Sequence, residues 1–567
     1  MTKLGIALFA IVLAWSAAFG ASGVERGTGG GVAAAEETAA RVGIEILQKG
    51  GNAADAAVAV AFALAVTWPE AGNIGGGGFW ISRDPRGRTL VVDFREVAPR
   101  AARRDLFLKP GPGGKTASST DGPLASGVPG SVAGLELAHR LAGKLPWKVL
   151  LEPAVRLARD GFVVSDVVHR SITLERNRLA ADPETASIFL PDGAAPASGA
   201  LWKQRDLART LVNIRDRGAD GFYRGLVARK IEESQQRLGG LITRGDLARY
   251  EARVRPAIEF RLGRARVFTT PAPSSGPALA EMTLLAQYVG LDKIVPGDAM
   301  AAHFLAEIEK RAYADRNRYL ADPGIVRVDQ KLFTDPSRLK AIAAKIPAHK
   351  ATPADALRST PAEKPTTTHF SVIDGFGGAV SVTTTLNDSF GNARVAPGLG
   401  FLWNNEMDDF TARPGQKNLY GLVQGEANTI APGKRMLSSM CPSIAVVDGR
   451  NALVWGSPGG ATIPTTNLQV MLNAVVRSEP LESAVAAPRF HQQDFPDKIQ
   501  YEEGRFDASW VEALEKLGHT VAIRVDETQR AATLGRVHAV ALGPDGQITA
   551  VADPRSGGVG LVVHPTP

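Results

Sequence analysis

The chain has 567 residues, of which 44% are hydrophobic and 22% charged, and its formal net charge is +7. This is the composition of an ordinary folded protein, long enough for several domains or for one large layered fold. Basic residues are interspersed with acidic ones and do not cluster with aromatic side chains, which argues against a nucleic-acid-binding protein.

The first 23 residues, MTKLGIALFAIVLAWSAAFGASG, contain one lysine, then an apolar stretch, then small residues. This order is typical of a secretory signal peptide, and we expect residues 1–20 to be removed before Ala21. An uncleaved membrane anchor is the alternative, although the stretch is short for a spanning helix. The sequence therefore predicts a periplasmic or secreted protein without stable membrane association. A single cysteine, Cys441, excludes an internal disulfide.

The first part of the mature chain mixes helices with a glycine-rich strand entry. Alanine, valine and leucine dominate residues 33–65 and predict a helix that is interrupted at Gly50-Gly51-Asn52. Four glycines at 75–78 lead into a strand predicted over 79–82, and a second strand is predicted over 89–94. The pattern from 130 to 343 favours helices.

Residues 344–366 are rich in proline, alanine, lysine and threonine and offer little to bury, so they predict a mobile linker or tail. The sequence then becomes rich in strands, beginning with a hairpin whose arms are 370–373 and 379–386. Two helices are predicted over 465–477 and 508–517. Further strands are predicted over 443–447, 452–455, 537–542 and 548–552. We interpret 344–367 as a functional seam and not as a domain boundary.

Several cofactor and catalytic signatures are absent from the sequence. Gly113-Gly114-Lys115-Thr116 resembles the end of a phosphate-binding loop, but Lys109 stands where the first glycine is required. The glycine clusters do not form G-x-G-x-x-G, and there is no G-x-S-x-G. The nine histidines form no H-x-H or H-E-x-x-H pair. We therefore predict no metal and no cofactor.

The stretch Thr366-Thr367-Thr368-His369 stands between the proline-rich segment and an apolar strand. Threonine is a weak nucleophile until a base takes its proton, and cutting the chain before it supplies its own α-amine as that base. An α-amine has a pKa near 7.7–8.0, whereas that of lysine is about 10.4, so it accepts a proton near neutral pH. The simpler alternative is a threonine-rich strand start, since β-branched residues favour strands.

Thr367-Thr368-His369-Phe370-Ser371 resembles the start of the small subunit of γ-glutamyltransferases (γ-glutamyltranspeptidases), which are self-cleaving N-terminal-nucleophile hydrolases. The resemblance extends from about residue 30 to 556, with motifs in the order of the family. These motifs are GGNAADAAVA, GNIGGGGF, DFRE, GVPGSVAGL, TTPAPSSG, YADRNRYLADP, TTHFSV, TTTLN, NNEMDDF, LSSM, GSPGG and DPRS. It implies an α/β fold, the four-layer αββα sandwich. It also implies a large subunit (21–366) and a small subunit (367–567) that stay together as a heterodimer.

The resemblance also assigns the catalytic residues. It places the cut between Thr366 and Thr367 and makes Thr367 the nucleophile. Thr385 corresponds to a second threonine that hydrogen-bonds the nucleophile, and Gly459 and Gly460 correspond to the oxyanion hole. From the sequence alone, Thr385 would be a strand residue and the two glycines a plain turn.

Further matched residues are implied to hold the substrate. Asn387, Glu406 and Asp409 would hold its α-ammonium group, and Arg95, Ser438 and Ser439 its α-carboxylate. Without the resemblance, Arg95 beside Glu96 would be interpreted as a surface ion pair. Asp408-Asp409 would likewise be interpreted as a loop or cap. The stretch 411–432 contains the segment that forms a lid in many members, and Tyr420 is implied to help close the pocket.

The implied reaction transfers the γ-glutamyl group of glutathione and related compounds, through an ester on Thr367, to water or to amino acids and peptides. Two alternatives remain open. A cephalosporin (glutaryl) acylase shares the fold and the nucleophile, but such enzymes tend to lack the lid and to alter the acids that hold the α-amino group. A non-catalytic periplasmic binding or scaffold protein is the other alternative.

Overall fold

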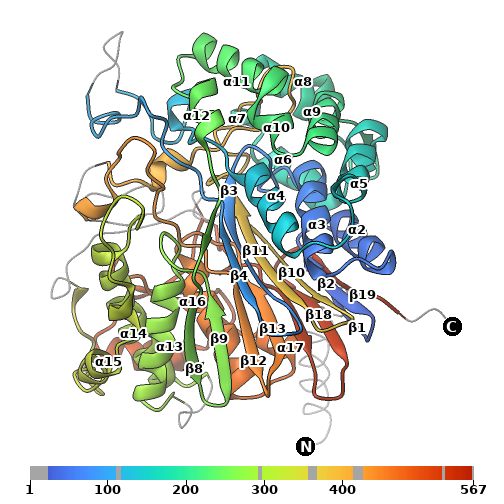
Figure 1. Cartoon of the computed structure of the whole chain (residues 1–567). Helices are drawn as coiled ribbons and strands as arrows, with labels where there is room; N and C mark the ends of the chain where they lie inside the picture. The colour runs from blue at the N-terminus through green and yellow to red at the C-terminus, as the bar shows by residue number, and fades with distance from the viewer. Residues whose placement is uncertain are drawn as a thin grey trace, which may run out of the picture.

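Two seven-stranded sheets, antiparallel throughout, lie face to face in the middle of the molecule (Figure 1). The structure, a computed structural model, describes residues 23–109, 116–291, 297–354, 367–412, 425–526 and 530–564. The predicted signal peptide, Thr366 and Tyr420 therefore lie outside the described residues. Within the described ranges, no helix is long and apolar enough to cross a membrane.

Each sheet combines strands from both sides of residue 367. The first sheet has the order β1 (Val24–Gly27), β18 (Ile548–Ala552), β17 (His538–Leu542), β13 (Arg450–Gly456), β12 (Ser443–Val447), β9 (Ala265–Thr269), β8 (Ile258–Leu262). The second has the order β19 (Val559–Val562), β2 (Gly30–Ala34), β10 (Thr368–Asp374), β11 (Ala379–Thr385), β3 (Gly77–Arg83), β4 (Thr89–Asp93), β7 (Arg253–Arg255). The hairpin β10–β11 thus lies in the centre of the second sheet, between strands from the first half of the chain.

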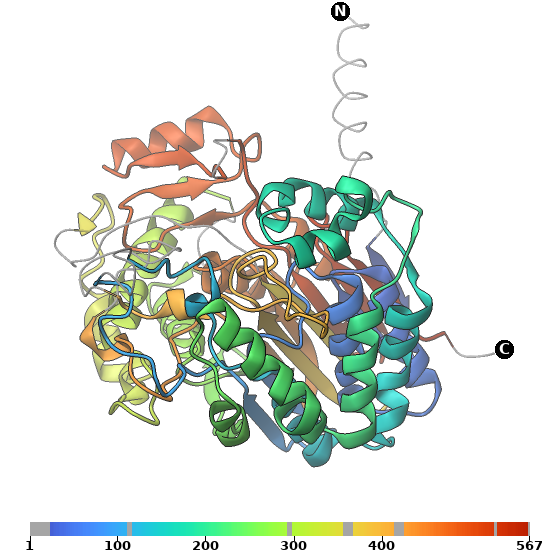
Figure 2. The ribbon, with the colours of Figure 1, turned by 90° about the horizontal axis from the view of Figure 1, so that it is seen from above.

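Helices cover the outer face of each sheet, which gives four layers and confirms the αββα sandwich (Figure 2). The second sheet is covered by α2 (Glu37–Gln48), α3 (Ala53–Thr67) and α4 (Ser131–Ala142), and α5 (Trp147–Asp160) packs on α3. The first sheet is covered by α13 (Gly276–Tyr288) and α16 (Thr462–Met471), and α14 (Ala299–Tyr319) packs on α13. All 15 residues of α3 are buried, as expected for a helix that is apolar on every side. Valine, isoleucine and phenylalanine side chains fill the space between the sheets.

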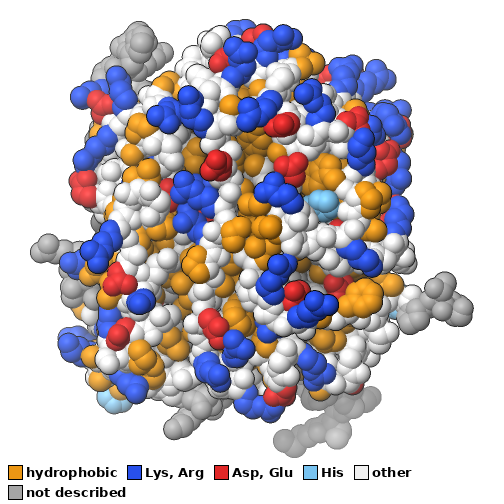
Figure 3. All heavy atoms as spheres, viewed as in Figure 1, with side chains coloured by type: hydrophobic (Ala, Val, Ile, Leu, Met, Phe, Trp, Pro, Cys, Tyr) orange, Lys and Arg blue, Asp and Glu red, His pale blue; other side chains and the backbone are white. Residues whose placement is uncertain are grey.

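The remaining elements surround this sandwich. Between residues 160 and 250 these are β5 (Phe162–Val163), α6 (Asp166–Leu174), α7 (Arg176–Leu179), α8 (Pro183–Phe189), β6 (Leu201–Trp202), α9 (Arg205–Arg217), α10 (Asp220–Tyr223), α11 (Gly225–Leu238) and α12 (Arg244–Arg249). Later elements are α15 (Pro336–Ala343), the π-helical turn Leu472–Val476, α17 (Leu481–Ala486), β14 (Phe490–His491), β15 (Ile499–Tyr501), α18 (Ala508–Lys516) and β16 (Val521–Ile523). On the face drawn in Figure 3, lysines and arginines alternate with acidic residues, in agreement with the composition.

Two sequence predictions about secondary structure are wrong in part. Residues 33 and 34 belong to β2, which pairs with β10 and β19, and the helix begins at Glu37. Residues 346–354 are not a loose linker, because their backbone groups have fixed partners. Thr352 N donates to Glu307 Oε1 at 2.9 Å, and Ala354 N donates to Asp497 Oδ2 at 2.7 Å. The rest of that predicted linker, 355–366, lies outside the described residues.

Candidate active site

Thr367 immediately precedes β10, and its side chain faces Thr385 at the end of β11. The two hydroxyl oxygens are 3.4 Å apart, at the outer limit of a hydrogen bond. Thr385 Oγ1 also accepts a hydrogen bond of 2.8 Å from the backbone N–H of Asn387. The hairpin sets this register through Asp374, whose Oδ1 accepts from the N–H groups of Phe376 and Gly378 in the turn. Residues 18 positions apart are thereby brought together.

His369 lies on β10, two residues after Thr367, in a polar layer between the sheets. Its Nδ1 is 2.8 Å from Thr383 Oγ1 and its Nε2 is 3.0 Å from Ser371 Oγ. Burial lowers the pKa of His369 well below its usual value, so the ring stays neutral. An added Cβ at Gly456 would be 2.4 Å from His369 Cε1, so only glycine fits there. His369 therefore has the contacts of a structural residue, with both ring nitrogens already engaged.

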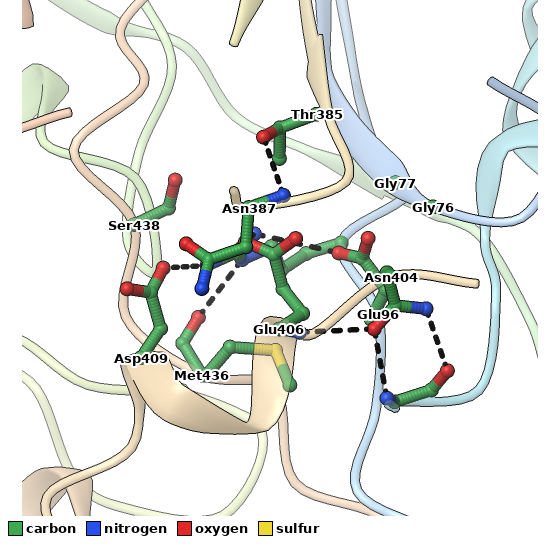
Figure 4. Close-up of polar contacts among 12 residues, drawn as sticks. Gly76, Gly77, Glu96, Thr385, Asn387, Asn404, Glu406, Asp409, Met436 and Ser438 are labelled. Atoms are coloured by element: carbon green, nitrogen blue, oxygen red, sulfur yellow. Dashed lines mark hydrogen bonds and ion pairs between the residues drawn. The ribbon is translucent and has the colours of Figure 1, made fainter. Parts of the chain in front are cut away.

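Arg95 is the centre of a buried charged cluster, whose acidic members Glu96, Glu406 and Asp409 are labelled in Figure 4. Its guanidinium forms ion pairs with Glu406 and Asp409 and lies 3.4 Å from Glu96 Oε2. It also donates to the backbone carbonyl of Met436 at 3.3 Å. Arg95 and Glu96 are both fully buried, so the alternative of a surface ion pair is wrong. Arg95 follows β4, whereas Glu406 and Asp409 belong to the 3₁₀ turn Glu406–Asp409. The fold therefore brings together residues that are far apart in the sequence.

The cluster holds more acidic groups than basic ones. Burial raises the pKa of Glu96 to about 7, raises that of Glu406 well above its usual value, and raises that of Asp409. Among the described residues, Glu96 Oε1 and Glu406 Oε2 are buried and have no hydrogen-bond partner. Unpaired buried acceptors are costly, and a cationic N–H donor would relieve that cost. The arrangement is therefore suited to an ammonium group.

The raised pKa of Glu96 predicts how the stability of the protein depends on pH. Its folded-state pKa, about 7, lies above the unfolded value near 4.5, so between these pH values the folded protein holds a proton that the unfolded chain has lost. The free energy of unfolding should therefore fall as pH rises from about 4.5 to 7, by about 3 kcal/mol from this group.

Urea unfolding of the Thr367→Ala chain, with and without Glu96→Gln, measures this effect. We expect a smaller fall with Glu96→Gln, part of it remaining because Glu406 and Asp409 also have raised pKa values. The exposed Glu512 provides the control variant Glu512→Gln. Equal falls in all three chains would contradict the assignment.

Asn387 and two adjacent serines complete the side of the site near Asp409. Asn387 adopts a positive φ of 81°, which asparagine tolerates better than most residues, and its Nδ2 donates to Asn405 O at 3.0 Å. The carbonyl of Ser438 accepts a hydrogen bond of 2.7 Å from Ser275 Oγ. Ser439 Oγ accepts one of 3.1 Å from Arg316. Both serines are buried.

Sequence reasoning assigned no role to Arg316 and Ser275, which hold the serine loop in place. Arg316 is fully buried, and its Nε donates to Ser275 Oγ at 2.7 Å. A signal was present, because both residues lie in the motifs YADRNRYLADP and TTPAPSSG. Those motifs supported the resemblance, but spacing could not show that α14 and the loop before α13 meet at Ser439.

Gly459 and Gly460 form a tight bend directly before α16. Their φ angles are +137° and +56°, in the region that favours glycine. The carbonyl of Gly459 accepts hydrogen bonds from Thr462 N at 3.1 Å and Thr462 Oγ1 at 2.8 Å. In a trans peptide unit the N–H points opposite to the C=O, so the N–H of Gly460 is directed away from α16.

A cavity of about 380 Å³ adjoins Thr367. Its lining includes Thr367, Glu70, Arg170, Ser171 and Arg536. Arg536 lies 3.2 Å from Glu70 Oε1, and Ser171 Oγ donates to Glu70 Oε2 at 2.6 Å. Neither Arg95 nor Asp409 lines it, so it is a space separate from the charged cluster.

In the described part of the chain, no group of three or more histidine, cysteine or acidic residues could hold a metal ion.

Two solved structures are similar to this chain. The crystal structure of a cephalosporin acylase from Bacillus halodurans is similar in fold, with a TM-score of 0.84 over 96% of this chain and 98% of that chain, at 24% identity. The γ-glutamyltranspeptidase of Helicobacter pylori matches 57% of this chain and 93% of that chain, with a TM-score of 0.55 and 34% identity.

Two bacterial sequences are similar over nearly the whole chain. A glutathione hydrolase proenzyme from Pseudomonas aeruginosa is 43% identical and covers 99% of this chain and 98% of its own length. One from Escherichia coli is 42% identical over 93% of this chain and 90% of its own length. The family model for gamma-glutamyltranspeptidase matches residues 39–563. The chain belongs to the γ-glutamyltranspeptidase family.

Proposed function

We propose that this protein is a γ-glutamyltransferase that cuts itself before Thr367 and then cleaves the γ-glutamyl amide bond of glutathione and related compounds. The observation that carries the proposal is the buried group of Arg95, Glu406 and Asp409. Asn387 donates to the carbonyl of Asn405, the residue before Glu406, and to Thr385 Oγ1, which lies 3.4 Å from Thr367 Oγ1. A guanidinium among carboxylates matches the carboxylate and the ammonium of a free α-amino-acid end.

When the α-amino-acid end of the substrate binds, its two charged groups would replace the ion pairs that Arg95 forms with the acids of the cluster. In the structure, Arg95 pairs with Glu406 and Asp409. A γ-glutamyl group brings an α-carboxylate for Arg95, Ser438 and Ser439. It also brings an α-ammonium for the two acids and Asn387. Both new pairs are charge-assisted. The substrate end is a zwitterion, so it leaves the net charge of the cluster unchanged while each of its ionic groups gains a partner of opposite charge.

The reaction then proceeds on the γ-carbonyl. Thr367 Oγ1 attacks the carbonyl carbon while the free α-amine of Thr367 takes its proton. The carbonyl oxygen becomes an oxyanion, which the N–H groups of Gly459 and Gly460 stabilise. The C–N bond breaks, and the leaving amine takes the proton from the α-amine. Water or an amino-acid or peptide amine attacks the resulting ester and restores Thr367.

The cavity next to Thr367 offers room for the leaving group and for the acceptor. Its volume of about 380 Å³ suits a small peptide, and Arg170 and Arg536 in its lining are suited to a carboxylate. Tyr420, which lies outside the described residues, remains a prediction: Tyr420→Ala should change hydrolysis, acceptor use or both.

Replacing Gly459 tests the oxyanion hole. An added Cβ would lie 2.4 Å from Thr462 Oγ1, on a backbone with φ of +137°. We expect Gly459→Ala to lower kcat by about 10²–10³ with a small change in KM, because the N–H groups are displaced from the position of the oxyanion. Steady-state kinetics on γ-glutamyl-p-nitroanilide measure this. Gly449→Ala, at a glycine with open space around it, is the control. Similar losses in both variants would contradict the role.

Two matched substrates distinguish the proposed function from the acylase alternative. γ-Glutamyl-p-nitroanilide and glutaryl-p-nitroanilide differ only in the α-amino group. We expect release of p-nitroaniline from the first and little from the second, because Glu406 and Asp409 are both present. Activity on the glutaryl compound alone would favour an acylase, and activity on neither would favour a non-catalytic protein.

The proposal also includes the boundaries of the signal peptide and of the two subunits, and export from the cytoplasm.

A further inference from the structure

A second cavity has a volume of about 560 Å³. Its walls come from the start of α14, the end of α16 with the π-helical turn, the loop before β14, and α18. None of the predicted site residues lines it. The volume is within the range of about 300–1,000 Å³ typical of small-molecule sites.

One wall of this cavity is aromatic. The rings of Phe506 and Trp510 are stacked with centroids 4.1 Å apart, and Phe490 lies 5.9 Å from Trp510. Trp510 is 5% exposed, and its Nε1 is a buried donor without a hydrogen-bond partner in the described part of the chain. Buried tryptophan N–H groups usually have a partner.

The cavity also contains two arginines. Arg477 donates to Asn473 Oδ1, and Arg505, which is exposed, donates to the carbonyl of Ala486 at 2.6 Å. Among the described residues, neither guanidinium has a carboxylate within 4.0 Å. Burial lowers the pKa of Arg477, which means that the protein environment does not fully compensate its charge.

The lining also contains three acidic residues, Asp298, Glu479 and Asp507, of which Asp298 and Asp507 are helix N-caps. Asp298 accepts from Met300 N at the start of α14, and Asp507 accepts from Trp510 N at the start of α18. Glu479 raises the pKa of Arg477 by its charge but forms no ion pair with it in the described structure. The lining therefore combines an apolar wall with basic groups that lack a close counter-ion.

We propose that this cavity binds a small amphipathic anion. Its ring or short apolar chain would pack on Phe490, Phe506 and Trp510, and its carboxylate, sulfonate or phosphate would be held by Arg477 and Arg505. The proposal is independent of the proposed catalytic function, because the cavity and the candidate active site share no lining residue.

Two fluorescent probes with the same rings test this proposal. 8-Anilino-1-naphthalenesulfonate carries a sulfonate, and N-phenyl-1-naphthylamine is its neutral counterpart. Both are titrated into the full-length wild-type protein and the Arg477→Gln/Arg505→Gln variant, with stoichiometry from calorimetry. We expect saturable 1:1 binding of the sulfonate to wild type, weakened at least tenfold in the variant, while affinity for the neutral probe changes less than twofold.

Arg505→Gln alone keeps the test valid if the double variant does not fold, since Arg505 is exposed; it should weaken sulfonate binding at least threefold. Arg261→Gln, at an exposed arginine on β8, should leave binding of both probes unchanged. The proposal is overturned if wild type shows no saturable sulfonate binding. It is also overturned if the arginine variants bind the sulfonate as wild type does, or if affinity for both probes falls equally.

Discussion

The Thr367→Ala chain is expected to remain in one piece and to have no activity on γ-glutamyl-p-nitroanilide. Alanine has no hydroxyl to attack the preceding carbonyl during self-cleavage, nor a substrate carbonyl afterwards. Wild type should give two fragments of roughly 37 and 21 kDa, in proportion to the 346 and 201 residues of 21–366 and 367–567 in a chain of 59.9 kDa. Denaturing electrophoresis and N-terminal sequencing of the smaller fragment measure this.

Two matched variants complete that experiment. Thr367→Ser keeps a hydroxyl and should still be cut, and Thr366→Ala should be cut to a fragment that still begins Thr-Thr-His-Phe. A Thr367→Ala chain that is cut at the same bond would show that another residue or a contaminating protease is responsible. The candidate nucleophile would then need to be sought elsewhere.

The second large effect is expected from Asp409→Asn. This carboxylate pairs with Arg95 in the structure and is proposed to receive the substrate ammonium. We expect kcat/KM on γ-glutamyl-p-nitroanilide to fall by about 10²–10³, the loss expected when one partner of a buried charged pair is removed. Any activity on glutaryl-p-nitroanilide, which has no ammonium group, should not fall.

The neighbouring acid supplies a control for that substitution. Asp408 is also buried, but it accepts a hydrogen bond from Ser119 Oγ and is not proposed to bind substrate. Asp408→Asn should lower kcat/KM by less than about tenfold, in line with loss of a single hydrogen bond. If Asp409→Asn lowers activity on both anilides equally, Asp409 supports the structure of the site and does not recognise the ammonium.

Local patterns in the sequence were sufficient for the elements with strong signals. The hairpin β10–β11 and the strands β3, β4, β12 and β13 lie where the sequence predicted strands. The fully buried α3 lies within the stretch where alanine, valine and leucine predicted a helix. Residues 33–34 were misassigned because alanine favours helices locally, whereas pairing with β10 and β19 decides their conformation. Strands β7, β8 and β9 were missed for the same reason, since only the completed sheets show their partners.

The candidate site depended on the resemblance, because its chemistry comes from residues that are distant in sequence. Arg95 with Glu96 could not be distinguished from a surface pair until the burial of both side chains was known. The contact of Arg316 with Ser439 requires a helix from one half of the chain to meet a loop from the other. Such contacts are products of the tertiary fold, and single-sequence periodicity does not contain them.

The alternation of strands from both sides of residue 367 determines when the proposed cut before this residue can occur. Five strand pairings, β1–β18, β9–β12, β2–β19, β2–β10 and β3–β11, join segments that precede this residue to segments that follow it. A fragment starting at residue 367 would contribute β10–β11 as an isolated hairpin, which is marginally stable in water. The chain must therefore fold before the bond preceding residue 367 is cut. Once the bond is cut, refolding becomes a bimolecular process that depends on protein concentration, so cleavage makes global unfolding difficult to reverse.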